Sequence, residues 1–385
     1  MYKRLLHKQI TDSRRSILVL GPRQVGKSTL LSSLEPDVEI NLADPATFRD
    51  YVTRPERLAD ELRAADNTVR TVFIDEVQKV PALLDVVQLF LDKSPRRFRF
   101  LLSGSSARKL RRGQANLLPG RVHVHYLHPL VASELGDHFD LDRCLAHGTL
   151  PGIYSEPDQD LRARDLQGYT DTYLREEVQA EALVRNIGGY ARLLELLAAS
   201  SGKVLNVNAL CRDAGVGYET ARRYMSVIED TLVGFSIPAW SGSDRTKLVS
   251  HPKTYLFDLG VRNALLRRPL DRPLPDERGL LFEHFVAQEL VRRMGTLWPE
   301  LRVYYYRTRH GLEVDFVVEM GEECWAVEVK SGRDVTRRAL RGVETVADRE
   351  RRVKRSIVVF LGERRQRIGC VDVLPLRDFL AELPV

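Results

Sequence analysis

The stretch SILVLGPRQVGKSTLLSSL, residues 16–34, decides the fold class of this chain of 385 residues. Its start, SILVL, is apolar and rich in strand-forming side chains, and its end, TLLSSL, suits a helix. Between them, GPRQVGKS fits the spacing G-x-x-x-x-G-K-[ST] of a loop that joins a strand to a helix around phosphate groups. The stretch therefore predicts an α/β fold in which a parallel sheet carries a nucleotide-binding loop after one of its strands.

Each position of this loop has a chemical role. Glycines let backbone N–H groups close around phosphate oxygens, and the N-terminus of the following helix adds the positive end of its dipole. Lys27 would neutralise the β- and γ-phosphates, and the Ser28 hydroxyl would coordinate Mg²⁺. We therefore expect ATP and Mg²⁺ to bind here. The expected binding residues are Gly21, Pro22, Arg23, Gln24, Val25, Gly26, Lys27, Ser28 and Thr29, with Asp75 from a later strand.

A second buried strand, TVFIDEV at residues 71–77, leads into two adjacent carboxylates. Asp75 would hold the Mg²⁺ together with Ser28, and Glu76 would orient or deprotonate the attacking water. The alternative is that the acidic pair only caps a helix after the strand. With the phosphate loop present, catalysis is the stronger interpretation.

Two further residues are candidates for sensing or stabilising the γ-phosphate. The strand that ends in LLSGSS, residues 101–106, places hydroxyls at its end, so Ser103, or Ser105 after it, would sense the phosphate. A serine-glycine turn that merely closes the strand is the alternative. Arg121 precedes the next strand and is a candidate arginine finger, acting in its own chain or on a neighbouring subunit. A solvated surface arginine is the alternative.

Composition bounds the remaining possibilities. With 43% hydrophobic and 29% charged residues, the chain has the composition of a folded protein of two or three domains. It has no apolar run of the ~18 residues that a membrane span needs and no signal-peptide core, so we expect a cytoplasmic location and no membrane partner. Four well-separated cysteines indicate reduced thiols, and a net charge of +6 permits attraction to nucleic acid.

The middle of the chain is predicted to be helical. Residues 141–200 would form a lid over the nucleotide, and residues 204–235 show a helix, a turn at Gly215 and a second helix that carries Arg222, Arg223 and Tyr224. That order is typical of a helix-turn-helix. Its second helix could enter the DNA major groove, or the segment could serve only as a lid or protein contact. Both interpretations remain open.

Acidic residues recur in the strands of the C-terminal third. If Gly321 and Glu322 form a hairpin turn between LEVDFVVEM and CWAVEVKSG, then Asp315 faces Glu328 and Glu313 faces Lys330 on one side of the hairpin. Facing carboxylates repel unless a cation, a proton or Lys330 compensates. A metal site would resolve the conflict. The alternative is an exposed face of cross-strand ion pairs without a metal.

Several segments together resemble a widespread family of prokaryotic AAA+-like ATPases: YKRLLHKQI, GPRQVGKSTLL, VFIDEVQKVP, LLSGSS, LPGRV and HPLVASEL. The resemblance implies an ATPase core at 1–140 with a parallel sheet, a helical lid and winged helix at 141–270, and an α/β restriction-endonuclease-like domain at 271–385. We find no arginine that fits the family's second sensor in the lid.

The acidic set of the C-terminal domain is similar to that of the PD-(D/E)XK nucleases. In that fold Glu283, from a helix, would bind one or two Mg²⁺ ions with Asp315 and Glu328, Mn²⁺ being a possible substitute, and Lys330 would polarise the water or the phosphate.

These observations lead to three hypotheses for function. The first is an ATP-driven machine that acts on nucleic acid, with DNA preferred and RNA open, and that controls a metal-dependent nuclease. The second is a nucleotide-dependent switch or scaffold in which the nuclease-like domain only binds partners. A small-molecule kinase is the third, and it leaves the C-terminal half without a role. A homo-oligomer is expected if Arg121 acts on a neighbour.

Overall fold

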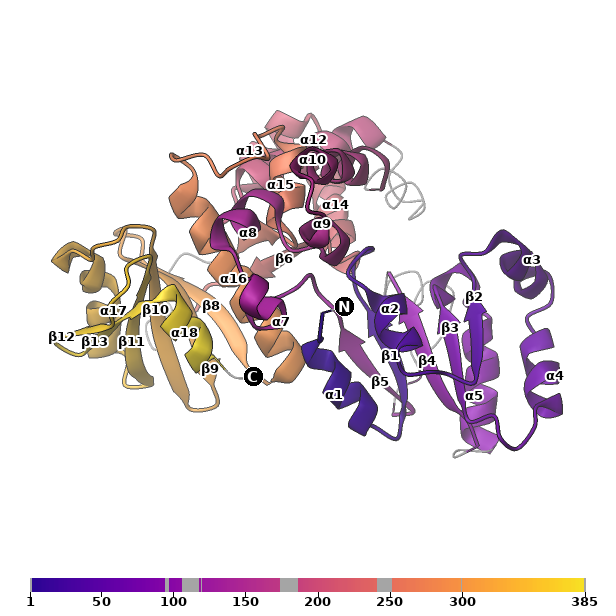
Figure 1. The fold of residues 1–385 in the computed structure, drawn as a ribbon. Coiled ribbons are helices and arrows are strands. Elements are labelled where there is room, and N and C mark those ends of the chain that lie inside the picture. Colours follow the sequence, from indigo (N-terminus) through magenta and orange to yellow (C-terminus); the bar gives the residue numbers. More distant parts are fainter. Residues whose placement is uncertain are drawn as a thin grey trace. The chain divides into compact units, whose positions relative to one another are not determined.

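The computed structural model describes residues 2–93, 97–105, 118, 120–173, 186–240, 251–298 and 300–383. Contacts within the chain divide it into two compact units (Figure 1). Unit 1 comprises Met1–Pro129 and Asp230–Leu232, and unit 2 comprises Leu130–Glu229 and Val233–Val385. Across the described ranges, no helix is both long and apolar enough to cross a membrane.

Unit 1 is built on a fully parallel sheet of five strands in the order β2-β3-β4-β1-β5. The strands are β1 (Ser16–Leu20), β2 (Val38–Asn41), β3 (Thr71–Asp75), β4 (Arg99–Gly104) and β5 (Val122–Tyr126). Strand β4, which is the strand predicted to end in LLSGSS, lies between β1 and β3. Strands β1, β3 and β4 are buried almost throughout, and this explains their nearly unbroken apolar sequences.

Helices connect these strands and pack on them. They are α1 (Leu5–Asp12), α2 (Lys27–Ser32), α3 (Pro45–Thr53), α4 (Arg57–Ala64), the 3₁₀ turn η1 (Val77–Lys79) and α5 (Leu83–Lys93). The start of α3 is fixed by Asp44, whose carboxylate accepts a hydrogen bond of 2.7 Å from the Thr47 amide, with Pro45 as the first helical residue. The AAA-like α/β core expected from the sequence is thus present.

Unit 2 begins with a helical region. Its elements are α7 (Ala132–Leu135), η2 (Gly136–His138), α8 (Leu141–His147), α9 (Pro151–Ser155), α10 (Gln159–Gly168), the π-helical η3 (Tyr169–Tyr173), α12 (Ile187–Ala199), α13 (Val207–Ala214), α14 (Tyr218–Asp230) and α15 (Leu259–Leu265). Helices α13 and α14 and the turn at Gly215, with φ of 66°, confirm the predicted helix, turn and helix. Arg222 and Arg223 are exposed on α14, whereas Tyr224 is buried.

Two short strands lie between α14 and α15 in the chain. Strand β6 (Gly234–Ile237) pairs antiparallel with β7 (Lys253–Leu256). The assignment of a winged helix to this region stays a prediction.

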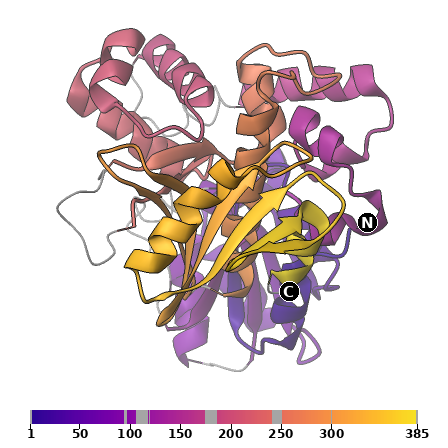
Figure 2. The ribbon, with the colours of Figure 1, turned by 90° about the vertical axis from the view of Figure 1, so that its left-hand side faces the viewer.

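The C-terminal sheet has six strands in the order β12-β13-β11-β10-β9-β8. They are β8 (Arg302–Arg307), β9 (Glu313–Met320), β10 (Glu323–Lys330), β11 (Val353–Phe360), β12 (Gln366–Ile368) and β13 (Val371–Pro375). Helix α17 (Arg337–Arg349) packs across β9, β10 and β11 (Figure 2), and α18 (Leu376–Glu382) ends the unit. The sheet mixes parallel and antiparallel pairs.

The hairpin of β9 and β10 has the register predicted from its turn. Pairing runs from Glu323 with Met320 to Val327 with Phe316 around Gly321, whose φ is 64°. Continued by one residue, this register brings Asp315 level with Glu328.

Helix α16 (Arg278–Leu297) joins the helical region to the C-terminal sheet within unit 2. It contacts α8 and α15 as well as β8 and β10. Its buried Arg292 donates to the Leu130 carbonyl at 3.0 Å and to the Thr149 hydroxyl at 2.8 Å. Helix α16 therefore packs against both the helical region and the C-terminal sheet. The domain boundary expected between residues 270 and 271 lies within unit 2.

Candidate functional site

The phosphate loop of unit 1 has a backbone that few residue types adopt. Gln24 and Gly26 have φ values of 60° and 91°, in the left-handed region. At Gly21, a Cβ atom would lie 2.2 Å from the Leu127 carbonyl oxygen, so a side chain there would collide with the chain leaving β5. The two glycines of the motif are therefore required by one close contact and one positive φ.

Lys27 lies inside the loop that precedes it. Its side chain is 5% exposed, and Nζ donates to the carbonyl oxygens of Gly21 and Pro22, each at 2.9 Å. Arg4, which the sequence analysis did not single out, supports the loop as well. Its guanidinium donates to the Val25 carbonyl at 2.7 Å and to the His128 carbonyl at 2.5 Å. Arg4 lies in the segment YKRLLHKQI, which contributes to the family resemblance, but no motif in that segment assigns it a contact with the phosphate loop.

Asp75, at the end of β3, accepts hydrogen bonds from two serines. The Ser28 hydroxyl donates to Oδ2 at 2.7 Å, and the fully buried Ser103 hydroxyl donates to Oδ1. Hydroxyl and carboxylate oxygens are the ligands that Mg²⁺ prefers. The pair Ser28 and Asp75 therefore fits the expected magnesium site.

Glu76 is held in a left-handed conformation, with φ of 58° and ψ of 41°. Its amide donates to the Ser103 Oγ at 2.9 Å, and its carboxylate accepts a hydrogen bond from Gln78 Nε2. Gln78 also donates to the Ser105 hydroxyl at 3.0 Å. The two predicted sensor serines therefore position Asp75, Glu76 and Gln78 in this state, and contact with a γ-phosphate stays a prediction.

Arg121 lies where the strands of the sheet begin, opposite the ends that carry the phosphate loop and Asp75. Ser16 pairs with Val122, so Arg121 stands beside the start of β1, whereas the phosphate loop follows the end of β1 at Leu20. At 3.3 Å per residue, the two levels differ by about 16 Å, which exceeds the reach of one side chain. An arginine finger acting within the same chain is therefore excluded. Arg121 pairs with Asp92 at 2.5 Å, and an action on a neighbouring subunit stays a prediction.

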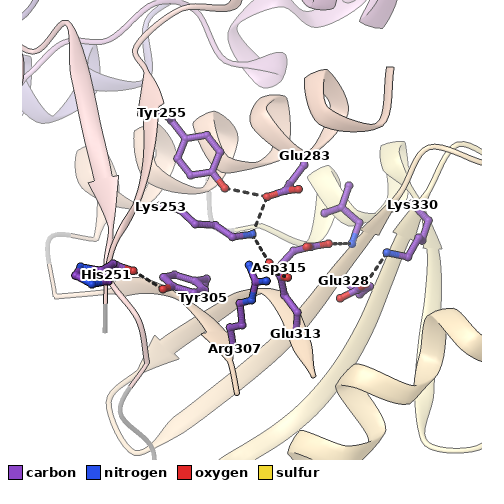
Figure 3. Close-up of polar contacts among 11 residues, drawn as sticks. His251, Lys253, Tyr255, Glu283, Tyr305, Arg307, Glu313, Asp315, Glu328 and Lys330 are labelled. Atoms are coloured by element: carbon purple, nitrogen blue, oxygen red, sulfur yellow. Dashed lines mark hydrogen bonds and ion pairs between the residues drawn. The ribbon is translucent and has the colours of Figure 1, made fainter. Parts of the chain in front are cut away.

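Four acidic side chains of unit 2 form what we call the C-terminal acidic cluster: Glu283, Glu313, Asp315 and Glu328 (Figure 3). A lysine that was not predicted from the sequence lies among them. Lys253 projects from β7, is 2% exposed, and places Nζ 3.0 Å from Glu283 Oε1 and 2.9 Å from Glu313 Oε1. The Tyr255 hydroxyl donates to Glu283 Oε1 at 3.0 Å.

The remaining groups of the cluster are engaged within the hairpin. Asp315 Oδ2 accepts a hydrogen bond of 2.8 Å from the Val329 amide, and Lys330 Nζ pairs with Glu328 Oε1 at 2.5 Å. Glu328 Oε2 is buried and accepts no hydrogen bond from the described residues.

Charge in the cluster is balanced by ammonium groups and protons. Burial and the neighbouring Asp315 raise the pKa of Glu283 to about 7 and that of Glu328 to about 8. Burial alone would lower the pKa of Lys253, but attraction to Glu283, Asp315 and Glu313 outweighs it and raises that pKa. Lys253 is therefore a permanent cation at neutral pH.

The predicted metal site does not fit this arrangement. The cation, the protons and the Lys330 ion pair already relieve the repulsion from which the metal was inferred. Among the described residues, no group of three or more histidine, cysteine or acidic side chains is arranged to hold a metal ion. Lys253 was not expected here, because it lies far from the hairpin in sequence and belongs to no motif, and binding of a metal by Glu283, Asp315 and Glu328 stays a prediction.

Comparison with known proteins covers the chain in three segments. Residues 13–136 match an AAA domain. The other two matches are domains of unknown function, DUF8612 over residues 138–272 and DUF4143 over residues 278–379. The AAA domain therefore coincides with the unit that holds the phosphate loop and Asp75, and it indicates a nucleotide-binding ATPase.

Two curated relatives extend over most of the chain. Uncharacterized proteins of Mycobacterium bovis and Mycobacterium tuberculosis are each 28% identical over 375 residues, which is 96% of this chain and 79% of the relative. Their names assign no activity that could pass to this chain.

Solved structures offer weaker likenesses. C. elegans PCH-2 aligns with 58% of this chain and 65% of its own length, at 16% identity and a TM-score of 0.22. A Vibrio cholerae protein aligns with 91% of this chain and 90% of its own, at 13% identity and a TM-score of 0.20. TM-scores this low support no conclusion about the AAA domain or unit 2.

Proposed function

We propose that the AAA domain hydrolyses ATP with Mg²⁺ at the site formed by the phosphate loop, Asp75 and Glu76. The observation that carries the proposal is the hydrogen bond of 2.7 Å from the Ser28 hydroxyl to Asp75, which links the phosphate loop to the end of β3. The loop and Lys27 bind the phosphates, and Ser28 and Asp75 hold the ion. Bound Mg²⁺ would neutralise charge on the phosphate oxygens.

Glu76 is the proposed general base for the attacking water. Ser103 positions it through the main chain, and Gln78 holds its carboxylate. A Glu76→Gln variant should bind ATP as the wild type does and hydrolyse it at least about 100-fold more slowly. Steady-state hydrolysis and calorimetric titration check this. Hydrolysis at the wild-type rate would contradict the assignment, and Lys27→Ala is the control that should lose ATP binding.

For the C-terminal domain, we favour a partner-binding role without cleavage over the nuclease hypothesis. The supporting observation is the Lys253 ammonium, which pairs with Glu313 and with Glu283, one of the three expected metal ligands. A positive charge at that point repels Mg²⁺ and Mn²⁺.

Cleavage and metal binding test this choice directly. DNA and RNA of varied form should remain intact with Mg²⁺ or Mn²⁺, with and without ATP. In a Ser28→Ala background, which weakens the nucleotide-site metal, Mn²⁺ titration should detect no further ion. Cleavage that Asp315→Ala abolishes would contradict the proposal and restore the nuclease hypothesis.

We further propose that the protein uses ATP to switch its binding of nucleic acid, with DNA preferred, and that it works as a homo-oligomer. The support is the net charge of +6, which favours association with a polyanion. Oligomerisation would also allow Arg121 to act on a neighbouring subunit. Mass measurement with and without nucleotide checks the oligomer, and a monomer in both conditions would remove the role of Arg121.

A further inference from the structure

Arginines precede four neighbouring strands of the unit 1 sheet. In the spatial order β3-β4-β1-β5, Arg70 precedes β3, Arg97 precedes β4, Arg15 precedes β1 and Arg121 precedes β5. All four strands are parallel, so these residues meet at one edge of the sheet. That edge is opposite the one that carries the phosphate loop, and the feature is therefore separate from the nucleotide site.

A pocket of about 770 Å³ lies at this edge. We call it the arginine pocket. Among the described residues that line it, none is acidic and six are arginines: Arg14, Arg15, Arg70, Arg97, Arg99 and Arg121. Like charges gathered around one pocket repel, and an anion in the pocket would relieve that repulsion.

Part of this charge is already engaged in the fold. Arg15 donates to the Gly120 carbonyl at 2.7 Å, Arg97 donates to the Ala65 carbonyl at 2.8 Å, and Arg121 pairs with Asp92. Contacts with neutral carbonyls leave the positive charge of Arg15 and Arg97 uncompensated. A guanidinium has five N–H donors, so these two arginines can bind further acceptors. Arg14 and Arg70 are exposed, and their side chains make no hydrogen bond or ion pair with the described residues.

The dimensions of the row indicate the kind of anion. Adjacent strands are about 4.8 Å apart, so the four strand starts extend over roughly 14 Å. In duplex DNA the phosphates of one strand rise by about 3.4 Å each along the helix axis, so a row of roughly 14 Å is long enough for more than one phosphate. Arginine suits this role because its planar guanidinium can bind phosphate oxygens in pairs.

We propose that the arginine pocket binds the phosphate backbone of a nucleic-acid strand without reading its sequence. This inference rests on the proposed function, because it takes nucleic acid as the partner, and it adds where on the chain the partner binds. It places the contact on the AAA domain rather than on the helix-turn-helix segment of unit 2.

The test compares two pairs of arginine substitutions in the full-length protein. Arg14→Gln with Arg70→Gln removes two charges from the pocket, and Arg222→Gln with Arg223→Gln removes two exposed charges from α14. Binding of a labelled single strand is followed by fluorescence anisotropy between about 50 and 200 mM salt. Thermal unfolding temperatures check that each variant folds, and Arg14→Lys with Arg70→Lys keeps the charge if the glutamine pair does not fold.

The double variant Arg14→Gln with Arg70→Gln, which we call the pocket pair, should bind the strand roughly tenfold more weakly at low salt. The slope of log K against log salt should become shallower by about 1.4, which is about 0.7 for each lost phosphate contact. The α14 pair should bind like the wild type, and the lysine pair should keep most of the affinity. If the α14 pair loses binding and the pocket pair keeps it, the inference is overturned and the nucleic-acid partner stands. If the wild type binds no strand at any salt concentration, both fail.

Discussion

Gln78 shows how the nucleotide site is organised at the scale of single residues. Glu76 occupies a left-handed conformation that costs a non-glycine residue about 1–2 kcal/mol. The site holds it there through the Ser103 hydroxyl at its amide and Gln78 at its carboxylate. Backbone strain of this kind persists where the surroundings over-determine it, as they do at many active sites. The side chain of Gln78 should therefore control where the proposed base points.

We predict that Gln78→Ala slows ATP hydrolysis by roughly tenfold, because a freely rotating Glu76 meets the water less often in a productive geometry. The affinity for ATP should not change, since Gln78 contacts Glu76 and Ser105 rather than the phosphate loop. Single-turnover rates and ATP titration separate the two effects. A loss of affinity at an unchanged rate would assign Gln78 to nucleotide binding instead.

Lys253 has the corresponding importance in the acidic cluster. Replacing it with methionine leaves Glu283 and Glu313 without their shared cation, so the variant should lose about 3–5 kcal/mol of stability. Urea unfolding at neutral pH measures the loss. Lys330→Met is the control, because Lys330 is 39% exposed and pairs with one carboxylate, so its removal should cost less. Equal stability of Lys253→Met and the wild type would show that protons alone balance the cluster.

At the scale of elements, local patterns predicted what depends on neighbours in sequence. The hairpin register followed from the Gly321 turn and from side chains that alternate along each strand. The helices on either side of Gly215 followed from periodicity and a glycine stop. The strand and loop of the nucleotide site followed from a motif whose residues are consecutive.

Features that depend on long-range packing were not predictable in this way. Lys253 reaches the acidic cluster from β7, a short strand paired with β6. No spacing rule connects such a residue with Asp315 or Glu328. The arginine row likewise depends on strand order, because Arg70 and Arg121 become neighbours of Arg97 and Arg15 only when β4 and β1 lie between β3 and β5.

Helix α16 carries a titratable group whose effect can be measured. Glu289 is fully buried, its Oε1 accepts a hydrogen bond of 2.8 Å from the Ala132 amide, and Oε2 has no hydrogen-bond partner among the described residues. Burial raises its pKa to about 7, although Arg293 and Arg292 oppose the change. A carboxyl with one unpaired buried oxygen is most stable when it keeps its proton.

The pH dependence of stability follows from this shift. Between about pH 4.5 and 7 the unfolded chain has lost the Glu289 proton while the folded chain keeps it, so stability falls as pH rises through this window and levels off above it. Glu289→Gln removes the titration. As the pH rises from 4.5 to 7, the free energy of unfolding of the variant should increase by on the order of 3 kcal/mol relative to that of the wild type. Denaturant unfolding at several pH values checks this, and a constant difference would contradict the raised pKa.

At the scale of the whole molecule, nucleotide binding should appear as a change in unfolding. A ligand that binds only the folded state stabilises it by about 2.7 kcal/mol at roughly 100 times its dissociation constant. We therefore expect ATP with Mg²⁺ to raise an unfolding transition of the full-length protein by several degrees in calorimetry. ATP with a chelator should raise it less, because Ser28 and Asp75 then lack the ion that links them to the phosphates.

Variants connect this shift to a particular site. Lys27→Ala should abolish it, since Lys27 is the ammonium that lies within the phosphate loop. Lys330→Ala is the matched control in the C-terminal sheet and should keep the full shift. If Lys27→Ala responds to ATP as the wild type does while Lys330→Ala does not, the nucleotide binds at the acidic cluster. The ATPase assignment of the phosphate loop would then fail for this chain, despite the match of residues 13–136 to an AAA domain.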